Sequence, residues 1–212
     1  MNLANLITLL RFPLLMVVVL LLYFGGWMGQ LAAASLTVVL IVMDSLDGNI
    51  ARRRQEVTLI GSALDIAADR TVEIVLWIAY GHLGLISIVI SMIVVLRGML
   101  TDSIRNVALS RGYSAHRMMR SPWSKWLVAS PSMRTGYAVV KATAFTLLAV
   151  ALGLRSWGLA AWRGVWIVAS ISSWLSLALC IVRGMPVLVD AEKLFGSHEF
   201  QDATFSPSER GT

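Results

Sequence analysis

The hydrophobic pattern divides the chain into six long apolar runs separated by short polar segments. The runs cover residues 12–28, 30–49, 58–80, 85–109, 132–153 and 164–183. About 20 apolar residues in a helix cross the hydrocarbon core of a bilayer. The pattern therefore predicts an all-α, polytopic integral membrane protein with about six transmembrane helices. Three short turns are predicted on one side of the membrane, at Gly25-Gly26, at residues 81–84 and from Arg155 to Arg163.

The two ends of the chain are more polar than the runs between them. Asn5, Thr8 and Arg11 recur at steps of three, which places them on one face of a helix. We expect a short N-terminal interfacial helix here. A cleaved signal peptide is the alternative, because three alanines follow at 32–34, but the first apolar run is long for one. We predict one membrane domain over residues 1–186 and a cytoplasmic C-terminal tail over 187–212, with its last ten or so residues disordered.

Composition narrows the class of protein further. The chain of 212 residues is 57% hydrophobic and only 14% charged, which excludes an ordinary soluble domain. Its one cysteine, Cys180, lies in an apolar run, so neither an intramolecular disulfide nor a thiolate metal site is expected. The net charge of +6 favours anionic lipid head groups and phosphorylated substrates as partners, and not nucleic acid, because no basic patch is interleaved with aromatic residues.

The most informative stretch runs from Asp44 to Asp69. It holds four carboxylates beside or inside apolar runs, at Asp44, Asp47, Asp65 and Asp69. Ionisable groups at membrane depth are costly, so they indicate function. On helices, Asp44, Asp47 and Ala51 share one face, and Gly61, Asp65 and Asp69 share another. Arginines 52–54 predict a chain reversal between them, so an antiparallel pair of helices brings the four carboxylates together.

Four neighbouring carboxylates predict a cation site, because like charges at close range disfavour ionisation. Hard oxygen ligands select Mg²⁺, Mn²⁺ or Ca²⁺. Two divalent ions held by carboxylates suit a displacement at phosphorus. Gly48 and Gly61 allow a ligand or a neighbouring backbone to come close. Arg52 is suited to neutralise a phosphate charge.

The same residues resemble the signature of the CDP-alcohol phosphatidyltransferase family, D-x2-D-G-x2-A-R-x8-G-x3-D-x3-D. Every position and spacing of that signature is present, at Asp44, Asp47, Gly48, Ala51, Arg52, Gly61, Asp65 and Asp69. The opening N-x-x-T-x-x-R resembles the start of many members. Intramembrane prenyltransferases also use aspartate-rich helices, but their aspartate clusters are not followed by G-x2-A-R.

The resemblance implies a role for each of these residues. A CDP-diacylglycerol donor, or its archaeal ether analogue, is attacked by an acceptor hydroxyl, and CMP leaves. The four aspartates hold two divalent cations, Mg²⁺ or Mn²⁺, and Asp69 is also the candidate general base. The implied CDP-binding residues are Gly48, Ala51, Arg52, Gly61, Asn5 and Thr8.

Three further arginines bear on the acceptor. The segment R-G-M-L-T-D-S-I-R-N, from Arg97 to Asn106, resembles the R-x7-R segment of bacterial phosphatidylglycerophosphate synthases, although their acidic neighbours are missing. Arg134-Thr135 resembles their K-T segment. Arg97, Arg105 and Arg134 predict a pocket for a phosphorylated acceptor, with glycerol 3-phosphate as first choice. Inositol 1-phosphate, serine and phosphatidylglycerol are the alternatives.

The arginine-rich loops also predict orientation and location. The motif loop carries arginines 52–54 and the loop at 110–131 carries Arg111, Arg117, Arg120 and Lys125, whereas the opposite turns carry only Arg155 and Arg163. By the positive-inside rule, both termini and the aspartates face the cytoplasm. We expect an inner-membrane protein that contacts membrane lipids, and the resemblance implies a homodimer. A catalytically silent lipid-binding protein and a transporter are the other classes considered. The four intact aspartates argue against a catalytically silent protein. The sequence has no pair of Gly- or Pro-broken helices, which argues against a transporter.

Overall fold

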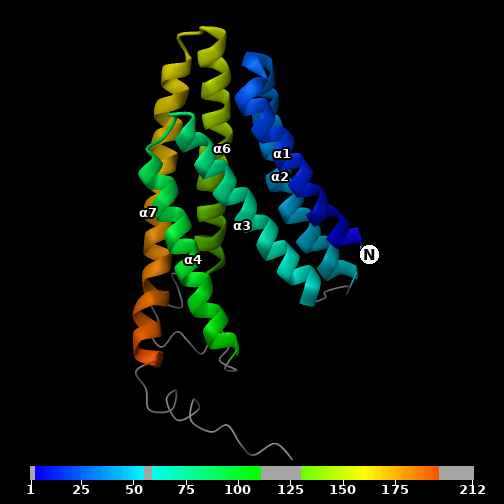
Figure 1. Cartoon of the computed structure of the whole chain (residues 1–212), viewed down its shortest axis with the longest axis vertical. Helices are drawn as coiled ribbons and strands as arrows, with labels where there is room; N and C mark the ends of the chain where they lie inside the picture. Colours follow the sequence, from blue (N-terminus) through cyan, green and yellow to red (C-terminus); the bar gives the residue numbers. More distant parts are fainter. Residues whose placement is uncertain (1–2, 55–58, 111–129, 196–212) are drawn as a thin grey trace, which may run out of the picture. The chain divides into compact units, whose positions relative to one another are not determined.

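Long helices make up the described part of the chain. The computed structural model describes residues 3–54, 59–110 and 130–195, and within these ranges it contains helices and connecting turns but no strand. The helices are α1 (Leu3–Phe24), α2 (Gly26–Arg54), α3 (Leu59–His82), α4 (Ile88–Ser110), α6 (Pro131–Trp157) and α7 (Trp162–Phe195) (Figure 1). The predicted all-α class is confirmed.

Four of these helices are long and apolar enough to cross a membrane. The candidate spans are Asn5–Phe24, Gly26–Asp44, Ser132–Trp157 and Trp162–Pro186. The fold is that of a polytopic membrane protein. Helices α3 and α4 occupy the two remaining predicted runs but are less apolar, because α3 carries Asp65, Asp69, Arg70 and Glu73 and α4 carries Arg97, Asp102 and Arg105.

The three short turns lie where the sequence predicts them. Each contains a glycine with a positive φ, Gly26 at 57°, Gly84 at 69° and Gly158 at 82°. Residues with a β-carbon rarely adopt a positive φ, so glycine permits the sharp reversal between successive helices.

Two helices run further than the sequence analysis expects. The expected short N-terminal helix is not separate, because Asn5, Thr8 and Arg11 belong to α1, which continues through Pro13. Helix α7 likewise continues through Pro186 to Phe195, past the predicted end of the membrane domain. Each proline removes one backbone donor, and the remaining hydrogen bonds on either side hold the helix together. The disorder expected at the end of the tail falls outside the described residues.

The described residues form two compact units. The first lies within residues 1–93 and 138–177, and the second within 94–137 and 178–212. In the first unit, α1 packs against both α2 and α3 (Figure 1). These three helices carry the aspartate motif and the residues at the start of the chain, so this packing positions the candidate site.

An aromatic cluster joins α3 to α6 within the first unit. Trp77, Tyr80 and Phe145 are each almost completely buried. The rings of Trp77 and Phe145 meet edge-on with centroids 4.8 Å apart, and the Tyr80 hydroxyl donates to the carbonyl of Phe145 at 2.9 Å. The Ser91 hydroxyl of α4 donates to the carbonyl of Trp77 at 2.6 Å. The three buried rings fix α3 against α6, and the Tyr80 hydroxyl is paired, whereas the Trp77 Nε1 atom has no hydrogen-bond partner among the described residues.

Candidate functional site

The two halves of the aspartate motif lie on two helices that both contact α1. Asp44 lies in α2, while Asp65 and Asp69 lie one turn apart near the start of α3. Asp47, Gly48, Ala51 and Arg52 are helical residues of α2, as predicted, but their side chains lie outside the described part of the chain. The chain reversal predicted after Arg54 includes residues 55–58, which also lie outside it.

A buried arginine brings the two halves together. One nitrogen of Arg11, Nη1, lies 2.7 Å from Asp44 Oδ1 and 3.7 Å from Asp65 Oδ1. The Arg11 side chain is 2% exposed, whereas those of Asp44 and Asp65 are 38% and 45% exposed. Because both carboxylates approach the same nitrogen, they are close to one another. The predicted convergence of the two motif halves is therefore present for this pair.

The third described aspartate lies near a second cation. Lys141 of α6 places its Nζ atom 3.9 Å from Asp69 Oδ1 and 3.5 Å from Glu73 Oε2. Glu73, 3% exposed, also has Arg70 Nη1 at 3.4 Å from the same oxygen. The Arg70–Glu73 ion pair agrees with its sequence spacing of three. Asp69 itself is 46% exposed, so its carboxylate is open to a ligand, while the side chain of Lys141 is only 15% exposed.

Arg11 and Lys141 are the two contacts that sequence reasoning missed. Arg11 entered the sequence analysis only as the third member of the N-x-x-T-x-x-R pattern, and Lys141 was not among the predicted site residues. The available signal is a lone basic residue within a membrane-length apolar stretch, which needs an acidic partner. Spacing alone names no partner, since both contacts join helices far apart in the sequence.

The described side chains fit a divalent metal in their chemistry. Asp44 and Asp65 offer hard oxygen donors, and the place where they meet already accommodates a positive charge on Arg11. Among the residues that the structure describes, no three acidic, histidine or cysteine side chains form a metal-binding group. Asp47, the fourth predicted ligand, is not among the described side chains.

The remaining predicted CDP-binding residues lie on the same packed helices. Thr8 is 3% exposed in α1, one turn before Arg11, and Asn5 is partly exposed one turn earlier. Gly61 lies one turn before Asp65 in α3 and is partly exposed. The packing of α1 on α3 is consistent with a shared site, although no described interaction assigns a nucleotide to it.

The predicted acceptor arginines belong to the second unit. Arg97 of α4 lies against α7, where a β-carbon added to Gly184 would approach Arg97 Nε to 2.5 Å. This Nε atom is buried and has no hydrogen-bond partner among the described residues. Arg134, in the first turn of α6, is exposed, and the side chain of Arg105 lies outside the described part. The described side chains thus show a confined position for Arg97 and an open one for Arg134.

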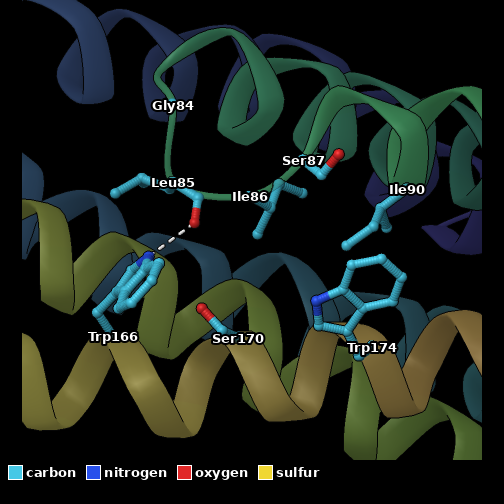
Figure 2. Close-up of a pocket in the computed structure, with 8 residues that line it drawn as sticks. All are labelled: Gly84, Leu85, Ile86, Ser87, Ile90, Trp166, Ser170 and Trp174. Carbon is cyan, nitrogen blue, oxygen red and sulfur yellow. Dashed lines mark hydrogen bonds between the residues drawn. The ribbon is translucent and has the colours of Figure 1, made fainter.

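A pocket at the other end of α3 is not the candidate site. Its volume is about 360 Å³, and it lies between the α3–α4 turn and α7 (Figure 2). Trp166 Nε1 donates to the carbonyl of Leu85 at 2.7 Å across it, and Ser170 and Trp174 also line it. None of its lining residues is acidic or basic, so it offers no ligand for a metal ion or a phosphate.

Comparison with known proteins assigns the chain to a family. The model of the CDP-alcohol phosphatidyltransferase family matches residues 1–182. The chain belongs to this family, whose members generally use a divalent metal. The resemblance inferred from the aspartate motif is confirmed.

A curated relative is similar over a shorter stretch. It is a CDP-diacylglycerol–glycerol-3-phosphate 3-phosphatidyltransferase from Pseudomonas fluorescens, 40% identical over 70 residues. The aligned stretch covers 33% of this chain and 36% of that relative, so the similarity spans about a third of either protein.

Proposed function

We propose that this protein is a phospholipid-synthesising transferase that moves a phosphatidyl group from CDP-diacylglycerol to glycerol 3-phosphate. One observation carries the proposal: Asp44 and Asp65, from the two halves of the family motif, meet at the same Arg11 nitrogen. Family membership supports the reaction type, and the name of the Pseudomonas fluorescens relative supports the acceptor.

The proposed metal ligands are Asp44, Asp47, Asp65 and Asp69, which would hold two divalent cations, Mg²⁺ or Mn²⁺. When bound, such ions neutralise charge on a reacting phosphate and acidify a bound hydroxyl. Carboxylate oxygens are the preferred donors for both metals. Asp44 and Asp65 suit this role because their carboxylates are partly exposed beside the buried Arg11, so a ligand reaches them without unfolding α1.

Asp69 is the proposed general base. The acceptor oxygen forms a bond to the lipid-side phosphorus of CDP-diacylglycerol, and the bond from that phosphorus to CMP breaks. The acceptor's proton passes to the Asp69 carboxylate, and CMP leaves with the bonding electrons. Lys141, 3.9 Å from Asp69, restrains the direction of this carboxylate, and a base must point at the proton that it takes.

The CDP moiety is proposed to lie along α1, α2 and α3. Gly48 and Gly61 allow its close approach, Arg52 neutralises a phosphate, and Ala51, Asn5 and Thr8 complete the contact set. The position of Thr8, one turn before Arg11 on the helix that packs against both α2 and α3, supports an approach from this side of α1.

The acceptor phosphate is proposed to bind Arg97, Arg105 and Arg134. The buried Nε of Arg97 supports this role, since a guanidinium nitrogen confined against α7 gains most from an anion that accepts from it. Arg binds phosphate in bidentate fashion, which favours a phosphorylated acceptor over serine. Inositol 1-phosphate remains the alternative with the same chemistry.

The site is proposed to face the cytoplasm from an inner membrane, in a homodimer, with membrane lipids around it. Loop charge supports the orientation, because positive residues near helix ends favour the cytoplasmic side. A cysteine placed beside Arg53 is expected to be shielded from impermeant thiol reagents in intact cells, and one beside Ser156 to be labelled. The reverse labelling would contradict this orientation.

One assay tests the function. Purified full-length protein is incubated with CDP-diacylglycerol, Mg²⁺ and one acceptor at a time, and the lipid product and CMP are measured. We expect phosphatidylglycerophosphate with glycerol 3-phosphate, and no product in EDTA. Greater turnover with serine or inositol 1-phosphate would overturn the acceptor, and absence of CMP release with every acceptor would overturn the activity.

A further inference from the structure

Arg11 is a basic residue of the first unit that is almost fully buried, as the acidic Glu73 is. The residue is 1% exposed and lies in the first half of α1, a helix that is apolar enough to span a membrane. A guanidinium in such a place is costly without anionic partners. Its partners include Asp44 of α2 and Asp65 of α3, so one side chain makes ion pairs with two other helices.

The two ion pairs differ in length, and this matters for a competing cation. The Asp44 contact, at 2.7 Å, is a close ion pair, whereas the Asp65 contact, at 3.7 Å, is looser. A Mg²⁺ ion binds carboxylate oxygens directly, at about 2.0–2.1 Å. An ion at this position would share these oxygens with a positive guanidinium. Like charges repel strongly where burial lowers the dielectric constant.

We propose that Arg11 is a built-in counter-cation that competes with the divalent metal for Asp44 and Asp65. This inference rests on the proposed function, in which these aspartates are metal ligands. Arg11 holds the carboxylates of α2 and α3 together when metal is scarce, and metal loading loosens its contacts with them. Arg11 thereby lowers the affinity of the site for metal and keeps α1, α2 and α3 assembled before loading.

A competing cation can be distinguished from a residue that supports metal binding by the effect of its removal on metal affinity. A residue that supports bound metal ligands strengthens metal binding, so its loss weakens binding. A competing cation has the opposite effect, so its loss strengthens metal binding and weakens the metal-free protein. The sign of the change in metal affinity therefore separates the two roles, and it can be read without measuring turnover.

The test compares Arg11→Gln with the wild type as purified full-length protein in detergent. Mg²⁺ and Mn²⁺ binding is measured by calorimetry, and thermal unfolding is followed in EDTA and in saturating Mg²⁺. In Arg11→Gln we expect metal affinity to rise roughly tenfold or more, from removal of one nearby like charge. We also expect a lower Tm in EDTA and a larger rise in Tm on adding Mg²⁺.

Arg155→Gln is the matched control, since it removes the same charge from an exposed position near the end of α6, away from the aspartates. It should bind metal as the wild type does. If Arg11→Gln does not fold even with metal, Arg11→Lys replaces it. A lysine keeps the charge but loses the forked guanidinium, so its hold on two carboxylates weakens and metal affinity should rise by several fold.

Unchanged or weaker metal binding in the variant that folds would overturn the competition proposed for Arg11. A wild type that binds no divalent metal would overturn it as well, together with the proposed metal site. If metal binding behaves as expected but no acceptor yields a lipid product, the proposed transferase function fails while the role of Arg11 stands.

Discussion

The two halves of α3 pack against the same neighbour, α6, by different physical means. The first half contacts Lys141 through Asp69 and Glu73, with ion-pair distances of 3.9 and 3.5 Å. The second half contacts Phe145, one turn further along α6, through Trp77 and Tyr80. The Trp77 and Tyr80 side chains are closed to solvent, whereas Asp69 in the charged half is 46% exposed.

This difference indicates a division of labour along one helix pair. Close-packed rings gain stability from burial and fixed geometry, and they hold α3 at a defined place on α6. Charges at longer distance contribute less to stability, because part of their interaction is lost to solvent and to desolvation. They leave oxygen atoms accessible to a ligand. The aromatic half thus supports the fold, and the charged half is the one to which we assign the proposed chemistry.

Removing a motif carboxylate should give the largest effect on turnover and little effect on folding. In Asp65→Asn we expect turnover to fall about 10²–10³-fold or more, the range for loss of one preorganised electrostatic group. Its Tm in EDTA should fall less than that of Arg11→Gln, because Arg11 keeps its closer ion pair with Asp44. CMP release and thermal unfolding measure the two quantities, and near-normal turnover would rule out the proposed metal arrangement.

Truncating the aromatic half should have the opposite profile. Phe145→Ala removes a ring that is 2% exposed and contacts both Trp77 and Tyr80. We expect the free energy of unfolding to fall by about 3–5 kcal/mol, as for large-to-small changes in cores. Well below its lowered Tm, the variant should keep near-normal turnover. A selective loss of turnover with unchanged stability would contradict the division of labour.

Substitution of the acceptor arginines tests whether the proposed substrate site extends beyond α3 to α4 and α6. In Arg97→Ala the KM for glycerol 3-phosphate should rise about ten- to a hundredfold, since one charge-assisted phosphate contact is worth about 1.5–3 kcal/mol. Donor KM should remain as in the wild type. Arg134→Ala should behave alike, and wild-type acceptor kinetics in both variants would place the phosphate pocket elsewhere.

Lys141→Met gives the smallest expected effect and the sharpest comparison with Phe145→Ala. We expect kcat to fall about tenfold, because Asp69 loses a group that restrains its direction. Stability should fall by only about 1 kcal/mol, since Arg70 still pairs with Glu73. Steady-state kinetics and thermal unfolding on the same preparation measure both. A stability loss as large as that of Phe145→Ala with unchanged kcat would give Lys141 a structural role only.

Several features of this protein could be predicted from sequence because they depend on local pattern. Apolar runs predict the helices, and Gly26, Gly84 and Gly158 lie in the predicted turns. The spacing of Asp65 and Asp69 places both on one face of α3, because a helix repeats every 3.6 residues. The motif from Asp44 to Asp69 identifies the family without any tertiary information.

Helix continuity was harder to predict. Pro13 and Pro186 suggest breaks, yet α1 and α7 continue through both. A proline weakens a helix by a fixed local amount, and the apolar residues on either side decide whether packing compensates for it. The separate N-terminal helix expected from the sequence is absent from the described structure for this reason.

Only the tertiary structure decided which charges meet. Arg11 contacts Asp44 and Asp65, and Lys141 contacts Asp69 and Glu73, across separations that no sequence period relates. Periodicity determines which face of a helix a residue occupies. The contact itself depends on how α1 and α6 are placed against α3, and that placement results from packing over the whole length of each helix. The spacing of the aspartates along the chain thus determines the acidic site locally. Which basic side chains, Arg11 and Lys141, contact these aspartates is determined only by the fold.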